Sequence, residues 1–273
     1  MQPWYGYPIL DCAMTTVYDI SQDAIEMATW RWAKPVKFYE VTDSTNDRAV
    51  EWARAGAKSG SLVVADHQTE GRGRGDRTWF SQPNLGSLLF SVILRPKLPP
   101  DQVSIVTMAM GISTSLALAE RRQANKLKWP NDIVTRGRKL GGMLSETEIQ
   151  DGKVNFVVCG VGVNMRITRD QFPKELQATA TSCVVETGRS YDRSEVLAGI
   201  LIHLDSALKD IAAGRIGPIL NQYRQMCDTI GKAISVRIDG KVIKATAVDV
   251  DEYGGLVLDT GDVIPAGDVT YLD

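Results

Sequence analysis

Residues 139–163 read KLGGMLSETEIQDGKVNFVVCGVGV. Apolar and polar residues alternate on both sides of Asp151-Gly152, and alternation of this kind is typical of β-strands. An Asp-Gly pair between two such runs is a strong signal for a tight hairpin turn. The sequence therefore predicts two strands, Lys139–Glu148 and Lys153–Val163, that are joined by this turn and run antiparallel.

Four shorter strands are predicted upstream of the hairpin. The run Leu62–Ala65 is apolar throughout, which is typical of a buried strand. The last run stops at Pro130, since proline cannot donate a hydrogen bond to a neighbouring strand. The predicted strands are Val36–Val41, Leu62–Ala65, Leu88–Leu94 and Lys126–Trp129.

Helical periodicity is present between the strands and after the hairpin. Ser44 is predicted as the N-cap of a helix, with Asp47 completing a capping box and Gly56 ending the helix. Val196–Ile211 carries apolar residues at helical spacing. Together these elements predict an α/β fold with a mixed, mainly antiparallel sheet flanked by helices. Further helices are predicted around Ala24–Trp32, Val103–Arg121 and Ile219–Met226.

The C-terminal tail differs from the rest of the chain. Short β-type runs there are separated by the pairs Asp239-Gly240, Gly254-Gly255 and Gly261-Asp262, and this pattern is typical of a small barrel. We therefore expect three segments: an N-terminal extension over residues 1–34, a main domain over 35–228 and a barrel over 229–273. The expected barrel strands are Ile234–Ile238, Val242–Val250, Leu256–Leu258 and Val263–Ile264.

Composition excludes several classes of protein. The chain has 273 residues, 44% of them hydrophobic, which is enough for a sizeable core. The net charge of −2 does not predict a wide basic face for DNA. Two histidines, His67 and His203, are too few to favour a histidine metal site or a Ser-His-Asp triad. His203 falls on a predicted helix and is interpreted as structural.

The cellular environment can also be predicted. The four cysteines form no C-x-x-C pair, which favours free thiols in a reducing compartment. No apolar run is judged long enough to span a membrane, and the N-terminus lacks the charged start and apolar core of a signal peptide. We expect a soluble, cytoplasmic protein. The cysteines are Cys12, Cys159, Cys183 and Cys227.

The stretch 71–79, GRGRGDRTW, predicts a loop that closes over a nucleotide-like ligand. Glycine allows close backbone approach, arginine binds phosphate or carboxylate, and Trp79 offers a face for stacking. A Walker loop is excluded because no Gly-Lys-Ser/Thr follows, and a dinucleotide fingerprint is excluded by Asp76. The stretch is also too short and too enclosed by apolar runs for a disordered nucleic-acid tail. A solvated surface loop remains the alternative.

Four other groups carry polar or glycine residues at strand ends, and each has an ordinary structural interpretation when taken alone. Residues 43–46 (DSTN) can simply cap a helix, and residues 128–132 (KWPND) can form an ordinary turn or offer oxygen ligands to Mg²⁺. Residues 138–146 place Lys139 before the paired glycines Gly141-Gly142, where its ammonium can be presented to a ligand that the backbone approaches closely. In residues 160–165 (GVGVNM) glycine interrupts an apolar strand, which marks a bulge or the approach of a ligand.

Taken together and in this order, the five groups closely resemble the biotin protein ligase family over roughly residues 36–270. The resemblance implies a class II aminoacyl-tRNA-synthetase-like catalytic domain followed by a small SH3-like barrel. It also implies an ATP-dependent ligase that makes biotinyl-5′-AMP and transfers biotin to a lysine of a carrier domain of a carboxylase. The expected substrates are biotin and ATP, and the expected cofactor is Mg²⁺.

The resemblance also implies roles for individual residues. Lys139 corresponds to the essential lysine near the biotin carboxylate, and Arg74 to a residue that seals the adenylate; both are predicted to be catalytic. Asp132 is the predicted Mg²⁺ ligand. The residues implied for biotin are Ser44, Thr45, Asn46, Gln68, Gly71, Arg72, Gly73, Arg74, Lys139 and Gly142, and those implied for ATP or the adenylate are Arg72, Arg74, Arg77, Trp79, Lys128, Asn131, Asp132 and Asn164.

The chain departs from the family pattern at two places. Gly75-Asp76 stands where the family loop commonly has Arg-Gly, and Val248 stands where some members carry an arginine in the barrel. Ala180-Thr181-Ser182 resembles a further short family motif. The segment before residue 36 is judged too short for a DNA-binding domain, so we expect a monofunctional ligase that binds no DNA and no membrane and is either a monomer or a homodimer.

Three other functions remain as alternatives. A lipoate–protein ligase or octanoyl transferase shares the architecture by family resemblance, but the Gly-Arg loop and the KWPND run favour biotin. A transcriptional regulator that senses biotinyl-AMP would need a DNA-reading helix pair. A biotin-binding protein without catalysis would not need the nucleotide half of the site.

Overall fold

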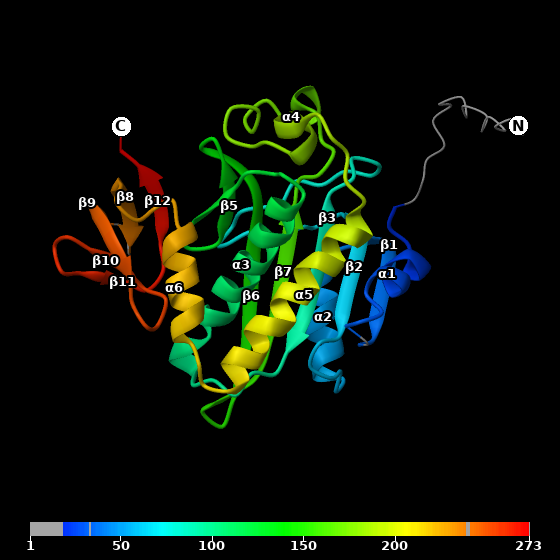
Figure 1. Cartoon of the computed structure of the whole chain (residues 1–273), viewed down its shortest axis with the longest axis horizontal. Coiled ribbons are helices and arrows are strands. Elements are labelled where there is room, and N and C mark those ends of the chain that lie inside the picture. The colour runs from blue at the N-terminus through cyan, green and yellow to red at the C-terminus, as the bar shows by residue number, and fades with distance from the viewer. Residues whose placement is uncertain (1–18, 33, 239–240, 273) are drawn as a thin grey trace, which may run out of the picture.

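The protein consists of a seven-stranded mixed sheet with helices on both faces and a second, smaller sheet near the C-terminus (Figure 1). The structure is a computed structural model that describes residues 19–32, 34–238 and 241–272. Most of the predicted N-terminal extension lies outside these residues. Its described part contains α1 (Gln22–Ala28), where a short helix was expected around Ala24–Trp32.

The strands of the main sheet lie in the order β1-β2-β3-β7-β6-β5-β4. Only β1 and β2 run parallel, and every other neighbouring pair is antiparallel, as expected for a mixed, mainly antiparallel sheet. The strands are β1 (Val36–Thr42), β2 (Leu62–Gln68), β3 (Leu88–Leu94), β4 (Lys126–Lys128), β5 (Asp132–Thr135), β6 (Arg138–Gln150) and β7 (Lys153–Val163).

The predicted hairpin forms the centre of this sheet. Asp151 and Gly152 connect β6 and β7 with φ angles of 51° and 71°, which is the left-handed conformation that a tight hairpin turn needs. The strand β7 also pairs with the whole length of β3, from Leu88 opposite Val163 to Leu94 opposite Val157. Its backbone is therefore bonded on both sides and is held in place.

Helices cover both faces of the sheet, so the central strands are apolar on both sides. The helix α2 (Thr45–Arg54) packs on one face against a cluster that includes Val63 and Phe156. The opposite face carries α3 (Ser104–Glu120) and α5 (Arg193–Ala212), which cross in front of the sheet in Figure 1. The two longest helices thereby keep one face rigid while α2 positions one end of the site.

The expectation that no apolar run is long enough to span a membrane is wrong. The short turn η1 (Pro100–Gln102) runs into α3, and a stretch of 18 residues within Pro100–Glu120 has a mean hydropathy of 1.5, so by length and composition this helix could cross a membrane. It is instead a core helix, since 67% of that stretch is buried inside the protein. Its apolar surface is covered by the sheet and by α5.

The capping box predicted at the start of α2 does not form. Ser44 occupies the N-cap position, but its side chain makes no capping hydrogen bond. The backbone N–H groups of Ser44 and Thr45 donate instead to Asp43 Oδ1, at 2.6 Å, and to Gln68 Oε1, at 2.7 Å. Asp47 pairs with Arg72. Tertiary partners therefore satisfy the helix end, and the Ser44 side chain lines a cavity.

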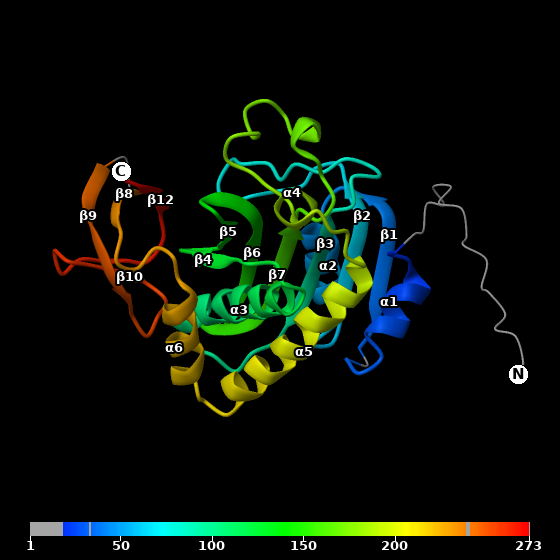
Figure 2. The same cartoon turned by 45° about the horizontal axis from the view of Figure 1, so that its top comes forward.

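The C-terminal part of the chain forms a five-stranded antiparallel sheet in the order β11-β10-β9-β8-β12. It follows α6 (Gly217–Met226) and lies beside the β4–β5 end of the main sheet, as both views show (Figures 1 and 2). The strand β12 was missed from the sequence, as were β5 and α4 (Cys183–Thr187). The strands are β8 (Ala233–Ile238), β9 (Lys241–Val250), β10 (Leu256–Leu258), β11 (Val263–Ile264) and β12 (Asp268–Tyr271).

Candidate active site

Two adjoining cavities lie at the ends of β2, β6 and β7, under the Gly/Arg loop (residues 71–79). This loop and the Asp132–Lys139 pair form the wall between the two cavities. Both are lined by Arg77, Thr78, Trp79, Asp132 and Lys139. The first cavity also contains Ser44, Thr45, Asn46 and Gln68, and the second contains Asn164 and Lys128. The fold thus collects residues from four of the five sequence groups around one site and places the fifth, Gly160–Met165, along its floor.

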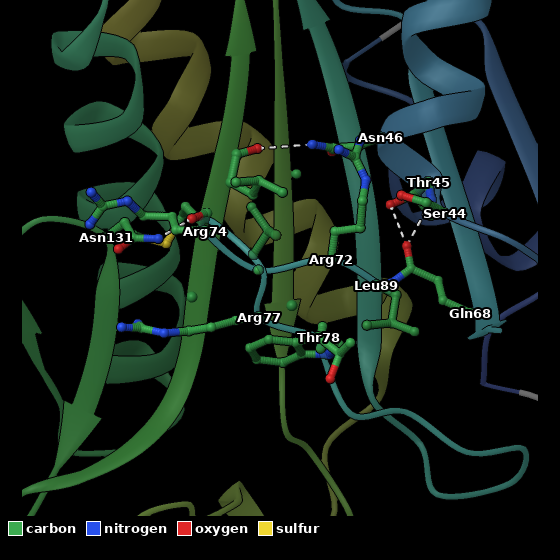
Figure 3. Close-up of a pocket in the computed structure, with 18 of the residues that line it drawn as sticks. Ser44, Thr45, Asn46, Gln68, Arg72, Arg74, Arg77, Thr78, Leu89 and Asn131 are labelled. Carbon is green, nitrogen blue, oxygen red and sulfur yellow. Dashed lines mark hydrogen bonds between the residues drawn. The ribbon is translucent and has the colours of Figure 1, made fainter. Parts of the chain in front are cut away.

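A chain of buried hydrogen bonds defines the far end of the first cavity (Figure 3). Gln68 Oε1 accepts from the backbone N–H of Thr45 at 2.7 Å and from Thr45 Oγ1 at 2.9 Å. Ser91 Oγ, on β3, lies 2.8 Å from Thr45 Oγ1 and 2.7 Å from Asn46 Oδ1. The side-chain oxygen of Gln68 is hydrogen-bonded to Thr45, so the amide nitrogen of Gln68 is available to a polar ligand. The Ser44 hydroxyl, which makes no capping bond, is available as well.

Both ends of the Asn46 side-chain amide are hydrogen-bonded inside the protein. Its amide nitrogen donates to the carbonyl oxygen of Leu144 at 3.1 Å and to Glu146 Oε2 at 2.9 Å. A Cβ atom on Gly160 would lie 2.1 Å from Asn46 Oδ1. The glycine in β7 is therefore a position of close approach, and it accommodates Asn46 rather than a bulge in the strand.

The Gly/Arg loop folds back on itself as a narrow ribbon. The N–H of Trp79 donates to the carbonyl oxygen of Gly71 at 2.8 Å, and the N–H of Gly73 donates to that of Arg77 at 2.7 Å. Gly75 stands at the tip with φ of +61°, a conformation that glycine adopts without strain. The departure from the family loop at Gly75 thus matches the turn that the backbone makes there.

Gly71 lies against Trp79 and Gln68 and does not line either cavity. A Cβ atom at Gly71 would lie 2.8 Å from the Trp79 carbonyl oxygen and 3.1 Å from Gln68 Nε2. Its contact with the ligand stays a prediction, and these two residues occupy the space that a side chain at this position would need. The other residues predicted for biotin line the first cavity.

The three arginines of the loop already have protein partners. Arg72 Nη2 lies 2.6 Å from Asp47 Oδ1 and 2.8 Å from Glu146 Oε2. Arg74 Nη1 donates to the Gly267 carbonyl oxygen at 3.0 Å, and Arg77 pairs with Asp268. In Figure 3 the Arg72 side chain extends toward Asn46, whereas Arg74 and Arg77 extend away from it.

Lys139 lies at the junction of the two cavities. Its Nζ is 2.6 Å from Asp132 Oδ1 on the neighbouring strand β5 and 5.7 Å from the centre of the Trp79 ring. A Cβ atom on Gly142 would lie 3.2 Å from Asp132 Oδ1 and 3.2 Å from Lys139 Cε, so the glycine leaves room for this pair. The amide nitrogen of Asn131 donates to the Met143 carbonyl oxygen, which turns its Oδ1 away from that strand.

The second cavity has an aromatic and apolar wall. Trp79 lies against β7, where a Cβ atom on Gly162 would be 2.5 Å from the Trp79 ring. Asn164 is buried and donates to the Thr181 carbonyl oxygen at 3.0 Å. Phe172 and Leu176 complete the wall, and neither was predicted, because they lie on an irregular segment without a recognisable motif.

Lys128 lies at the edge of the second cavity, with its Nζ 4.5 Å from the centre of the Tyr271 ring on β12. Burial lowers the pKa of Lys128, and the nearby Asp132 carboxylate opposes this effect. Its contact with β12 shows that the C-terminal sheet forms part of the same region of the protein.

Comparison with known proteins identifies the family. The sequence matches the Biotin/lipoate A/B protein ligase family over residues 38–164 and the Biotin protein ligase C terminal domain over residues 229–270. It is 32% identical over 241 residues to the biotin--[acetyl-CoA-carboxylase] ligase of Mycobacterium tuberculosis, covering 85% of this chain and 86% of that protein. It is also 34% identical to the bifunctional ligase/repressor BirA of Bacillus spizizenii, covering 83% of this chain and 70% of that protein.

The fold agrees with these relationships. The biotin protein ligase of Aquifex aeolicus, solved in complex with biotin and ATP, superimposes with a TM-score of 0.73 at 28% identity, covering 88% of this chain and 99% of that chain. Both the catalytic sheet and the C-terminal antiparallel sheet are therefore those expected from the resemblance. The chain belongs to the biotin protein ligase family.

Proposed function

We propose that this protein joins biotin to a lysine of a carboxylase carrier domain at the expense of ATP. The observation that carries the proposal is the pair of cavities that meet at Lys139 and Asp132. One cavity has the hydrogen-bonding side chains that a neutral polar ring needs, and the other has the aromatic wall that a nucleobase needs. A reaction between the two ligands would take place where the cavities join.

The first step joins biotin to AMP. A carboxylate oxygen of biotin attacks the α-phosphorus of ATP, the bond to the β-phosphate oxygen breaks, and pyrophosphate leaves. Two anions must approach each other, and like unit charges at 4 Å repel by about 4 kcal/mol at an effective dielectric constant of 20. We assign the offsetting positive charge at the junction to Lys139, which must exchange its contact with Asp132 for one with the ligands.

The second step transfers biotin to the carrier. The unprotonated amine of the carrier lysine attacks the acyl carbon of biotinyl-5′-AMP, the carbon–oxygen bond to phosphate breaks, and AMP leaves while the new amide nitrogen loses a proton. The adenylate must be kept from water until the carrier arrives. We assign this protection to the Gly/Arg loop, whose tip is held by the bond from Arg74 to Gly267, the residue directly before β12.

We also propose that Mg²⁺ accompanies ATP. The described residues contain no group of three or more His, Cys, Asp or Glu side chains that could hold a metal alone. Asp132 and the Oδ1 of Asn131 are hard oxygen donors beside the junction, and they suit Mg²⁺, which is usually bound by one or two carboxylates together with substrate phosphates. When bound there, the ion would neutralise phosphate charge and stabilise the leaving pyrophosphate.

Lipoate is the main alternative substrate, because the matched family includes lipoate ligases. The far end of the first cavity favours biotin: Ser44, Thr45 and Gln68 can bond to a ureido group, whereas the dithiolane ring of lipoate has no such groups. Mass spectrometry of a carrier domain after incubation with enzyme, Mg-ATP and either vitamin tests this choice. Labelling by lipoate and not by biotin would refute the proposal.

We propose residues 35–228 as the catalytic unit and 229–273 as the barrel domain, as the division between the two sheets and the match over residues 229–270 suggest. Transcriptional regulation is not favoured. The net charge of −2 does not predict a wide basic face for DNA. A gel-shift assay on operator DNA with biotin and ATP present tests the absence of DNA binding.

A reducing, cytoplasmic location remains a proposal. It is supported by three free and buried cysteines, Cys159, Cys183 and Cys227, while Cys12 lies outside the described residues. Burial raises the pKa of both Cys159 and Cys183 to about 12, so these thiols are not suited to redox or nucleophilic roles.

A further inference from the structure

We propose that Glu146 is a positioning residue that couples closure of the Gly/Arg loop to the shape of the biotin pocket. The inference rests on the proposed function and adds a residue that none of the sequence motifs singled out for a role. Glu146 lies on β6, two residues beyond the cavity-lining Leu144, and its carboxylate contacts two different elements of the site.

The carboxylate of Glu146 is shared between the pocket and the loop. Its Oε2 accepts from Asn46 Nδ2 at 2.9 Å. Both of its oxygens accept from Arg72 Nη2, at 2.9 and 2.8 Å. Asn46 belongs to α2 and Arg72 to the loop, so a single side chain on the rigid central hairpin fixes both.

Asn46 depends on this contact for its orientation. Its Oδ1 accepts from Ser91 Oγ at 2.7 Å, and its Nδ2 donates to Glu146 and to the Leu144 carbonyl oxygen. Gly160 leaves no room for the amide to move toward β7. Removing the negative charge of Glu146 would therefore weaken one of the two bonds of the amide nitrogen and loosen the orientation of Asn46, which lines the first cavity.

Arg72 has a structural role under this proposal. Its Nη2 lies between Glu146 and Asp47, and its side chain extends toward Asn46 and away from Arg74 and Arg77 (Figure 3). We infer that Arg72 closes the first half of the loop over the biotin end of the site, while Arg74 and Arg77 attach the second half to the C-terminal sheet.

Asp47 is the lesser partner. It makes a single contact with Arg72, at 2.6 Å, and is not bonded to Asn46. Burial raises the pKa of Asp47, and the charge of Arg72 opposes this effect. Of these two carboxylates, only that of Glu146 contacts both Asn46 in the pocket and Arg72 in the loop. Substitutions of Glu146 and of Asp47 should therefore have different effects.

The test compares Glu146→Gln with Glu148→Gln. Glu148 is two residues further along β6 and also pairs with an arginine, Arg54, at 2.7 Å, but it does not line either cavity. We would measure the Kd for biotin alone by calorimetry and the KM for ATP by pyrophosphate exchange. A charge-assisted bond of a partly exposed group predicts about a tenfold weaker Kd for biotin in Glu146→Gln.

The expected pattern is a split between the two ligands. Glu146→Gln should weaken biotin binding and leave the KM for ATP within about twofold, and Glu148→Gln should change neither. Arg72→Gln removes the other partner of Glu146 and should also weaken biotin binding if Glu146→Gln proves unstable, whereas Asp47→Asn should have the smaller effect. These ratios separate positioning from a general loss of structure, which would weaken both ligands together.

Two results would overturn the inference: a Kd for biotin in Glu146→Gln equal to that of Glu148→Gln, or an equal loss of affinity for biotin and ATP. If the unaltered protein binds biotin but exchanges no pyrophosphate, the proposed function fails. The biotin measurement would still decide the role of Glu146.

Discussion

Replacing Gly162 by alanine should push Trp79 out of position and weaken ATP binding. A Cβ atom on Gly162 would lie 2.5, 2.6 and 3.0 Å from three atoms of the Trp79 ring, where ordinary contacts are at least 3.4 Å. One of the two must therefore shift by nearly 1 Å. The strand β7 is bonded to β3 and β6 at this residue, opposite Leu89 and Gly142, so we expect the ring to move.

The size of the effect follows from the two contacts involved. Inserting a methyl group into a packed site costs about 1–3 kcal/mol. Stacking of a base on an aromatic side chain is worth about 1–3 kcal/mol. If the ring gives way, the loss falls on nucleotide binding and not on the folded state, and the KM for ATP should rise about 10- to 100-fold.

Pyrophosphate exchange at saturating biotin would measure the KM for ATP, and thermal unfolding would report stability. Gly217→Ala is the matched control, because Gly217 has no atom within 4 Å of its Cβ position and lies in the first turn of α6. The reasoning is refuted if Gly162→Ala keeps the KM for ATP of the control. A fall in Tm without a change in KM would mean that the strand moved instead of the ring.

Three further predictions test other parts of the site. Lys139→Ala should lower the rate of pyrophosphate exchange by about 10²- to 10³-fold, because about 4 kcal/mol of repulsion between the two anions is left without an offset. The control Lys153→Ala, at the hairpin, should not lower it, and equal rates in the two variants would contradict the role of Lys139. Arg74→Gly should release biotinyl-5′-AMP about tenfold faster in a filter or chromatographic assay, because the loop loses its bond to Gly267. Release as slow as that of the unaltered protein would refute the role of Arg74 in retaining the adenylate. The pKa of Asp228 is lowered in the folded state, because the opposing effect of burial is outweighed by hydrogen bonds from two lysines. Its charge therefore stabilises the folded state at pH values above the ordinary Asp pKa, and this contribution disappears as the pH falls through the lowered pKa. Asp228→Asn should therefore reduce the free energy of unfolding by about 1 kcal/mol at pH 7 and by much less at pH 2–3; a pH-independent loss in urea titrations would contradict this account.

Much of the secondary structure could be predicted because its causes are local. The Asp151-Gly152 turn takes up positive φ angles whatever surrounds it, and the apolar runs on either side become strands at the predicted positions. Strands without such signals were missed. The strand β5 follows Pro130 and has only four residues, and β12 alternates weakly; both form because a neighbouring strand supplies their hydrogen bonds.

The sequence by itself determined most of the strands and helices and most of the residues that line the site, because turn chemistry and hydrophobic periodicity act over a few neighbouring residues. Only the tertiary structure decided what those residues do to one another. Ser44 was predicted to cap its own helix, yet Gln68 from another strand bonds to that helix end, and Asn46 fits only because Gly160 lies opposite it. Such contacts join residues more than twenty positions apart, so they depend on strand order and register, which no local pattern specifies.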